Sequence, residues 1–545
     1  MRSVLTVLCL LLALPVLGVL GAWLIFDADA WQVLRHQAGT VLPGYALQSA
    51  LLAAGVAVGV MLLGTVCAAA VTLFDFPGRR SFEWALLLPM AMPAYVLAYA
   101  WTDGLQYGSP LQMALRQALG LQGPLWPDVR SLWGAVILFV LCLYPYVYLL
   151  ARTALSERAV QLLEAARLLG AGPRRRILAV ALPLARPAIM AGVALALMET
   201  LADYGVGAYF GLTTFSTGII KAWLVMNDGV AAAQLASMLL AVVALLLAAE
   251  RAAQRRLRFA SGRAGPGQAA DGRPLPLRRG AAVLAWLLCA VPVLLGFVLP
   301  VAWLGWMLWQ EAHNAELGLP LARFAGWAWS SFRLAAAAAL LAAGLALALG
   351  FALRQRGSPW LHGAARLLSL GYAVPGAVVA IGILLPAGWL QQRWPQLPIA
   401  AAVTGTLLGV MLAYLSRFSA VALQSIEAGY ARVPLSIDET ARMLGAGSAR
   451  LFWRLHAPLL RRSTLAAALL VFVDVMKELP ATLVLRPFGS DTLAVVAFNF
   501  ARDERLGEAA LPSLAMVAVG LVPVMMLSRA LRGPTRTLDP EFSAP

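Results

Sequence analysis

Four carboxylates interrupt two long apolar stretches of this 545-residue chain. Glu199 and Asp203 lie four residues apart, and Asp474 and Glu478 repeat that spacing 275 positions later with the two acids exchanged. Residues spaced by four lie on one face of a helix. Ionisable groups at membrane depth are costly and default to a functional role, and their hard oxygen donors suit a highly charged hard cation. We therefore expect these carboxylates to line a path through a helical bundle.

Two other roles for the carboxylates stay open. They can form structural ion pairs with Lys221, Lys477 or Arg486, or they can contact an extracellular delivery protein. A conduit has to release its cargo, so no tight metal site is predicted. The four cysteines have no CxxC spacing and predict neither a metal site nor a disulfide framework. The histidines are expected to be surface residues rather than ligands: His36, His313, His362 and His456.

A short polar phrase occurs twice in the chain. Residues 161–172 read QLLEAARLLGAG, and residues 436–447 read SIDETARMLGAG. Five identities recur at the same offset of 275 residues, two of them charged: Glu164 and Glu439, Arg167 and Arg442, Gly170 and Gly445, Gly172 and Gly447, and Pro183 and Pro458. The fixed offset indicates that one unit was duplicated and fused.

Each copy of the phrase predicts a short helix lying across the membrane surface. Glu164-Ala-Ala-Arg167 is good helix-forming sequence, and the Gly-Ala-Gly segment supplies the left-handed turn that ends a helix. The alternative is an amphipathic helix that merely caps the bundle. Capping does not require the same Glu, Arg and Gly at both sites, so the duplication favours a docking element for two identical partners.

Composition places the chain in a membrane. It is 61% hydrophobic and only 12% charged, with a mean hydropathy of +0.79, whereas soluble domains carry roughly 25% charged residues. Helices of about 20 apolar residues span a bilayer, and twelve such runs are present, six on each side of an Arg-rich break. They are residues 4–26, 46–74, 84–103, 131–152, 187–209 and 231–249, then 281–307, 333–353, 367–388, 398–415, 463–485 and 510–530.

The arginines gather in alternate loops, which predicts that both termini are cytoplasmic. The first apolar run is too long for a signal peptide and is expected to be a retained span. Despite the net charge of +16, no aqueous basic domain is present that would bind nucleic acid. An even number of spans in each half makes the repeat parallel.

We therefore predict an all-α membrane protein of about 12 transmembrane helices in two parallel six-helix repeats. The predicted parts are a first helix and outer loop (1–43), a first repeat (44–250) with a cytoplasmic loop (153–186), a linker (251–280), a seventh helix and outer loop (281–326), a second repeat (327–530) with a cytoplasmic loop (416–462), and a cytoplasmic tail (531–545).

The duplicated phrase resembles the cytoplasmic EAA loop of binding-protein-dependent ABC importer permeases, in which Glu-Ala-Ala is followed after three to four residues by Gly. In the second copy Thr440 replaces the first Ala. AMPAYVLAYAWTD (91–103), YAVPGAVVAIGILLP (372–386) and residues 198–223 and 473–515 are similar to fused permeases of ferric iron importers. The resemblance implies the type I permease fold in a bacterial inner membrane and iron(III) as cargo. Thiamine, phosphonate and polyamine permeases share much of this architecture.

The resemblance also implies partners and roles. Two copies of an ATP-binding subunit would dock at the two loops, and an extracytoplasmic binding protein would deliver the cargo. The coupling residues implied are Glu164, Ala165, Ala166, Arg167, Gly170 and Gly172 in the first loop, and Glu439, Ala441, Arg442, Gly445 and Gly447 in the second. The chain has no GxxxxGK[ST] loop, so it is not expected to be an enzyme, to carry catalytic residues or to bind a cofactor. A secondary transporter and a non-transporting membrane scaffold are the competing classes.

Overall fold

The computed structural model describes residues 2–25, 28–156, 166, 168–261, 275–314, 319–355 and 358–531. The helices of the first half are α1 (Arg2–Leu12), α2 (Leu14–Gly21), α3 (Ala28–Gly39), α4 (Leu42–Leu73), α5 (Arg79–Ala85), α6 (Ala94–Leu105), α7 (Pro110–Leu119), α8 (Leu132–Ala154), α10 (Pro173–Arg176), α11 (Leu182–Ala202), α12 (Gly205–Tyr209), α13 (Phe215–Leu224) and α14 (Gly229–Ser261).

The second half follows a similar plan. Its helices are α15 (Arg279–Val293), α16 (Leu299–Asn314), α17 (Leu321–Arg354), α18 (Pro359–Leu368), α19 (Gly376–Arg393), α20 (Ile399–Thr404), α21 (Leu408–Tyr430), α22 (Leu435–Met443), α23 (Ser448–Leu451), α24 (Ala457–Leu459), α25 (Arg461–Lys477), α26 (Pro480–Leu485), α27 (Leu493–Arg502) and α28 (Leu506–Leu531). Short 3-10 or π segments are η1 (Ala22–Ile25), η2 (Leu88–Ala91), η4 (Ile177–Ala181), η5 (Leu294–Val298), η6 (Gly371–Ala373) and η7 (Phe452–His456).

Eight helices of the described residues are long and apolar enough to cross a bilayer. Two bent pairs, α1 with α2 and the helices on either side of Pro93, raise the number to ten if each pair is one span. The predicted spans 367–388 and 463–485 are not in this set. In the second of these regions α25 carries Arg461, Arg462, Asp474 and Lys477, and α26 follows only after a break. The chain is therefore a multi-pass helical protein, and the number twelve stays a prediction.

The duplication extends to backbone irregularities. The π-helical turns η4 and η7 lie 275 residues apart, one after each copy of the duplicated phrase. Nearly the same offset separates the end of α11 from the end of α25. It also separates the short helices that follow them, α12 and α26. Both halves therefore reproduce one chain path in detail, rather than a common hydropathy alone.

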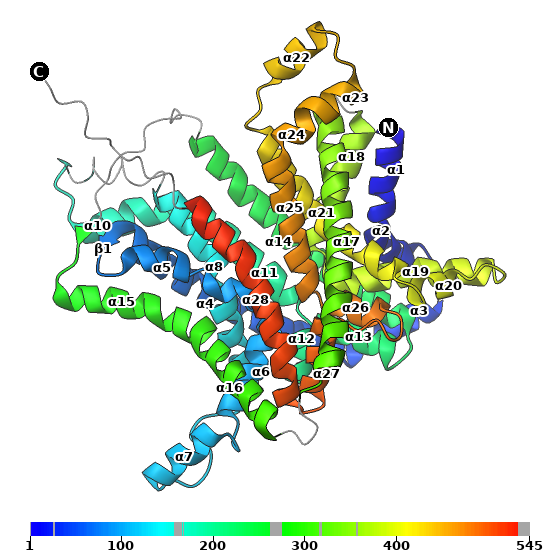
Figure 1. Cartoon of the computed structure of the whole chain (residues 1–545). Coiled ribbons are helices and arrows are strands. Elements are labelled where there is room, and N and C mark those ends of the chain that lie inside the picture. Colours follow the sequence, from blue (N-terminus) through cyan, green and yellow to red (C-terminus); the bar gives the residue numbers. More distant parts are fainter. Residues whose placement is uncertain are drawn as a thin grey trace, which may run out of the picture.

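The first span of each half packs against the other half. Helices α1 and α2 contact α18 and α19, while α15 and α16 contact α4, α5 and α6, so the dark-blue and green segments lie across the boundary between halves in Figure 1; α16 also packs against α28 of its own half. Glycine permits the closest of these approaches: a Cβ at Gly382 would lie 1.9 Å from the carbonyl oxygen of Pro15. Each half therefore completes its packing with a helix from the other.

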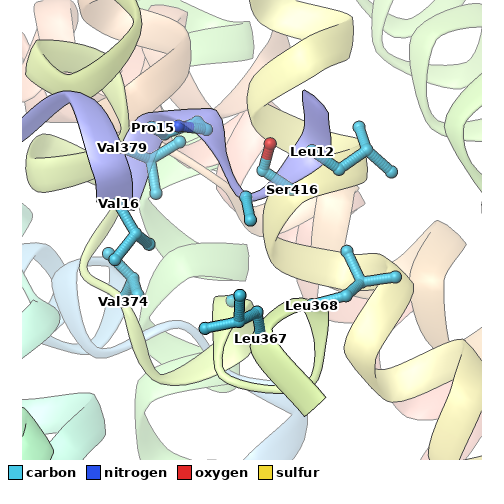
Figure 2. Close-up of a pocket in the computed structure, with 10 residues that line it drawn as sticks. Leu12, Pro15, Val16, Leu367, Leu368, Val374, Val379 and Ser416 are labelled. Carbon is cyan, nitrogen blue, oxygen red and sulfur yellow. The ribbon is translucent and has the colours of Figure 1, made fainter. Parts of the chain in front are cut away.

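The bend between α1 and α2 encloses a small cavity of about 10 Å³. Figure 2 shows Leu12, Pro15 and Val16 around it, together with residues of the second half that include Ser416 on α21. The Ser416 hydroxyl is buried and has no hydrogen-bond partner. This volume is at the lower limit for one water molecule, so the crossing is tightly packed.

A short parallel strand pair joins the end of the linker to the first half. Residues Phe74–Asp75 (β1) pair with Leu275–Pro276 (β2). No pattern in the sequence predicts this contact. It fixes the start of α15 beside the end of α4, where α15 packs against both α4 and α5.

Candidate functional site

The carboxylates Asp203 and Glu478 end their helices in the same way. The Asp203 Oδ1 accepts a hydrogen bond of 2.8 Å from the Val206 N–H. The Glu478 Oε1 accepts one of 3.1 Å from the Ala481 N–H, and its Oε2 one of 3.0 Å from the Thr482 N–H. Both side chains thus accept hydrogen bonds from the first N–H groups of the short helices α12 and α26, from the position one residue before the N-caps Tyr204 and Leu479. Two of the four predicted path residues hold a duplicated break in the backbone.

Only one of these two carboxylates has a buried ion-pair partner within the described residues. Arg417 on α21 donates from Nη1 to Glu478 Oε1 over 3.0 Å, and both side chains are about 90% or more buried. Thr482 Oγ1 also donates to Glu478 Oε2 over 2.7 Å. A Cβ at Gly376 would come within 2.5 Å of Glu478 Oε1. The start of α19 therefore approaches this pair closely because residue 376 is glycine.

Arg417 corrects the sequence reading. The loop arginines placed it at the cytoplasmic surface, in the predicted loop 416–462, but it lies inside α21 and is 9% exposed. At the equivalent position in the first half stands Cys142, whose thiol donates to the Met92 carbonyl. The basic partner therefore has no counterpart in the first half. No pattern in the sequence separated this arginine from its cytoplasmic neighbours.

A cavity of about 20 Å³ lies between the two halves. Glu199 and Tyr146 line it from the first half, and Tyr372 and Arg417 from the second. The Arg417 Nε is buried without a hydrogen-bond partner. The space is sufficient for about one water molecule. Glu199 thus lies where the halves meet, beside the arginine that pairs with Glu478.

Asp474 and Lys477 extend this group of charges. Asp474 interacts electrostatically with Lys477, Glu199 and Arg417. The Lys477 Nζ donates to the Met90 carbonyl of the first half over 3.1 Å. Within the described part of the chain, no three His, Cys, Asp or Glu side chains are placed to hold a metal ion. The group is therefore a mixed charged interface between the halves and has no geometry for chelation.

One of the four carboxylates forms an ion pair, but its partner is a residue that the sequence did not suggest. Glu478 pairs with Arg417, whereas Arg486 pairs with Asp491 over 2.7 Å. Glu199 faces the interface cavity. The structure therefore divides the four carboxylates: two hold helix breaks, and two lie in the charged interface between the halves.

The two copies of the duplicated phrase share a turn. Gly170 and Gly445 have φ values of +80° and +79°, the left-handed conformation that ends a helix. The Ala171 N–H donates to the Ala166 carbonyl over 2.9 Å, and the Ala446 N–H to the Ala441 carbonyl over 3.0 Å. Glu164, Ala165 and Arg167 lie outside the described residues, so only the end of the first copy is compared.

Both turns carry a pair of exposed apolar side chains. Leu168 and Leu169 are 89% and 87% exposed, and the equivalent residues Met443 and Leu444 are 89% and 81% exposed. In the second copy Glu439 and Arg442 are exposed as well. In Figure 1, α22 stands at one end of the molecule, away from the packed helices. Large apolar side chains exposed at equivalent places indicate surfaces that a partner covers.

His456 corrects a second prediction. It was expected at the surface, but it is fully buried at the end of η7. Its Nε2 lies 3.3 Å from Asp438 Oδ1, and its ring is 5.1 Å from that of Phe351. Burial lowers the pKa of His456, and the neighbouring Arg354 and Arg442 act in the same direction against the attraction of Asp438. The side chain is therefore a neutral packing residue at neutral pH.

Two duplicated halves, a charged interface between them and two exposed loops at equivalent positions define a membrane permease built from paired units. The family model described as "Binding-protein-dependent transport system inner membrane component" matches residues 60–259 and 341–533, and the chain belongs to this family. It is therefore an ABC importer permease with two fused permease units, and membership sets aside the secondary-transporter and scaffold alternatives. The family transports and is not enzymatic.

Several relatives have names that state a cargo. The Fe(3+)-transport system permease protein FbpB 2 of Haemophilus influenzae is 25% identical over 480 residues, covering 87% of each chain. The putative 2-aminoethylphosphonate transport system permease protein PhnV of Salmonella typhimurium is 28% identical over 45% of this chain and 93% of its own length. PhnU of Salmonella paratyphi A is 30% identical over 29% of this chain and 55% of its own length.

Proposed function

We propose that this chain is the transmembrane subunit of an ATP-driven importer that moves iron(III), delivered by an extracytoplasmic binding protein, into the cytoplasm. The observation that carries the cargo assignment is the extent of likeness: the Fe(3+)-transport relative matches over 87% of both chains. The interface between the halves adds support for a cationic cargo, because Glu199 faces its cavity and Asp474 lies in the same group of charges. Carboxylate oxygens are ligands that hard cations prefer.

The path runs between the two halves in this proposal. Glu199 and Asp474 are its lining carboxylates, and Asp203 and Glu478 fix the helix breaks beside them. The narrow cavity of about 20 Å³ at Glu199 corresponds to a closed conformation. Rearrangement of one half against the other opens the path alternately to each side.

The two duplicated loops are the proposed docking sites for two ATP-binding subunits, one per half. Their matched left-handed turns and exposed apolar pairs support identical partners. Glu439, Ala441, Arg442, Gly445 and Gly447 form the second site. Glu164, Ala165, Ala166, Arg167, Gly170 and Gly172 form the first. ATP is bound and hydrolysed by the partner subunits.

The proposed setting is the bacterial inner membrane with both termini in the cytoplasm. The arginine-rich loops support this orientation. The linker that contains residues 262–274 and the second docking loop then lie on the cytoplasmic side. Helix α7, which projects at the opposite end of the molecule from α22 in Figure 1, lies on the outer side, where the binding protein would dock.

A phosphonate cargo is the second candidate. Its support is the identity of 28–30% to PhnV and PhnU, which exceeds that to the ferric relative but extends over only part of this chain. The buried Arg417 Nε without a partner is a group that a phosphonate oxygen would accept from.

Uptake by a deletion strain tests the cargo. Cells that lack this gene, complemented with the native chain, should accumulate radiolabelled iron(III), and cells complemented with a Glu164→Ala and Glu439→Ala double variant should not. 2-Aminoethylphosphonate uptake in the same cells is the comparison. Normal ferric uptake in the deletion strain, with lost phosphonate uptake, would overturn the iron assignment and select the second candidate.

A further inference from the structure

The second docking helix is attached to the membrane bundle by a buried ion pair. Asp438, which directly precedes Glu439, is the one buried residue of α22. Its Oδ2 accepts from Arg354 Nε over 2.7 Å, and its Oδ1 lies 3.4 Å from Arg354 Nη2. The two side chains are 8% and 6% exposed. Since the remaining residues of α22 are exposed or half-buried, this carboxylate is the principal attachment of the helix.

Arg354 joins three elements at this point. It is the last residue of α17, its Nη2 donates to the Pro434 carbonyl over 2.9 Å, and its Nη1 donates to the Tyr430 carbonyl over 3.4 Å. Pro434 precedes α22, and Tyr430 ends α21. One guanidinium therefore holds the ends of two membrane helices and the start of the docking helix together.

His456 closes the same cluster from the other end of the loop. Its ring lies 5.5 Å from that of Tyr430 and 5.1 Å from that of Phe351 on α17. It ends the π-helical turn η7, which leads back into the membrane. The loop is thus fixed to the bundle both before and after its exposed turn.

The first half has different residues or contacts at the positions equivalent to this cluster, as far as its described residues and its sequence show. Arg79 occupies the position equivalent to Arg354, but it donates to the Val71 carbonyl and lies 3.7 Å from Asp75 and 3.9 Å from Glu83. Leu163 stands in the sequence where the second half has Asp438, and Ala181 where it has His456. Neither residue can supply a charge to the first docking loop.

The cluster connects to the interface between the halves through one helix. Helix α21 carries Tyr430 at the cluster and Arg417 at the interface cavity. Thirteen residues of helix separate them by about 20 Å. A displacement of α22 that moves the end of α21 therefore reaches Arg417, which pairs with Glu478, through a continuous helix.

We propose that Arg354, Asp438 and His456 form a positioning clamp that transmits movement of the second docking helix to α17 and α21, and that the first half has no equivalent clamp. This inference rests on the proposed docking role of the two loops. It makes the two loops mechanically unequal: both bind an ATP-binding subunit, whereas the second is rigidly linked to the charged interface.

The test uses the full chain, assembled with its ATP-binding subunit in nanodiscs or proteoliposomes and supplied with iron(III)-loaded binding protein. Removing one partner of a buried pair leaves an unpaired charge that can itself prevent folding. The main variant is therefore the apolar pair Arg354→Met with Asp438→Leu, which keeps the packing. It should still co-purify with the ATP-binding subunit but transport about tenfold less per ATP hydrolysed.

A readout independent of cargo accompanies this ratio. Hydrogen exchange of α21 should change when the ATP-binding subunits bind nucleotide in the native complex, and the change should be lost in the paired variant. Arg79→Gln, at the equivalent position of the first half, is the matched control and should leave both readouts as in the native complex. Unchanged transport per ATP and unchanged exchange in the paired variant, or an equal loss in Arg79→Gln, would overturn the clamp.

Glu439→Ala separates this inference from the function on which it rests. If Glu439→Ala abolishes co-purification or transport while the paired variant behaves as native, the clamp alone is wrong. If Glu439→Ala and Glu164→Ala both leave co-purification and transport intact, the docking role of the loops is wrong. Loss in both Glu439→Ala and the paired variant, with Arg79→Gln unaffected, is the expected result.

Discussion

The two halves of the molecule repeat one backbone path, but their equivalent buried carboxylates have different partners. In the first half Asp203 accepts a hydrogen bond from the start of α12, and Cys142 stands where the second half has Arg417. In the second half the equivalent Glu478 accepts hydrogen bonds from the start of α26 and also pairs with Arg417. The ends that carry the duplicated phrase differ as well, because the described residues bring Arg354, Asp438 and His456 together in the second half. Both halves therefore share the duplicated backbone path, but the basic side chains that pair with buried carboxylates, Arg354 and Arg417, belong to the second half.

The largest expected difference between the halves is at the buried ion pair. Arg417→Met leaves Glu478 as an unpaired buried charge and should destabilise the protein by about 3–5 kcal/mol. Cys142→Ala removes a small buried group at the equivalent position and should destabilise it by only about 1 kcal/mol. Thermal unfolding of the detergent-solubilised chain, followed by fluorescence-detected size exclusion, measures both. Equal losses would mean that Arg417 contributes packing alone.

Acid pH should affect the loop that carries the second copy of the duplicated phrase, through His456. Its pKa in the folded protein is lowered by burial, so the unfolded chain takes up the proton first as the pH falls. The contribution to stability is complete above the ordinary histidine pKa of about 6.5 and declines below it, by at most about 1.4 kcal/mol per pH unit. The unfolding temperature of the native chain should therefore fall more steeply below about pH 6.5 than that of His456→Ala, which restores the first-half residue. Parallel pH profiles would contradict this.

Loss of the Asp203 hydrogen bond in the first half should have a smaller effect. Asp203→Ala removes the hydrogen bond to the Val206 N–H and should destabilise the protein by about 1 kcal/mol. Asp203→Asn is the matched control, because the asparagine side-chain oxygen also accepts hydrogen bonds, and it should stay close to native. The same thermal-unfolding measurement applies. A large loss of stability in Asp203→Asn would show that the negative charge matters more than the hydrogen bond.

The smallest expected effect is at the outer contact between the halves. Arg130, which precedes α8, forms two hydrogen bonds with Glu504, of 2.8 and 2.9 Å, and Arg130 also donates to Tyr209. The bond to Arg130 lowers the pKa of Glu504. The pair is partly exposed, so Glu504→Gln should lower stability by at most about 1 kcal/mol, and less at high salt. Asp503→Asn is the control, since Asp503 is bonded to the adjacent Arg502 rather than across the halves.

The sequence predicted the features that follow from periodicity and repetition. The apolar runs predicted a multi-pass helical protein, and the 275-residue offset predicted the duplication. The left-handed turns at Gly170 and Gly445 followed from glycine at a helix end. Each of these features depends on the sequence pattern alone, so it can be predicted without knowing any tertiary contact.

Other features depend on contacts between distant residues. From the sequence alone, Arg417 cannot be distinguished from the other arginines predicted to be cytoplasmic, because its partner Glu478 is 61 positions away. His456 reads as a surface residue in a loop because its burial is created by Phe351 and Tyr430 on other helices. The number of spans stays a prediction where helices break, as at Pro93 and Pro375, since hydropathy records the apolar run but not the bend within it.

The exchange of first spans between the halves changes what the linker contributes. Helices α1 and α2 lie on α18 and α19, and α15 and α16 lie on α4, α5 and α6. The two halves are therefore held together by extensive helix packing at more than one place. The segment between α14 and β2 then acts mainly as a tether that raises effective concentration. We expect a chain cut between residues 262 and 274 to keep the packed contacts between α1, α2 and the second half and between α15, α16 and the first half.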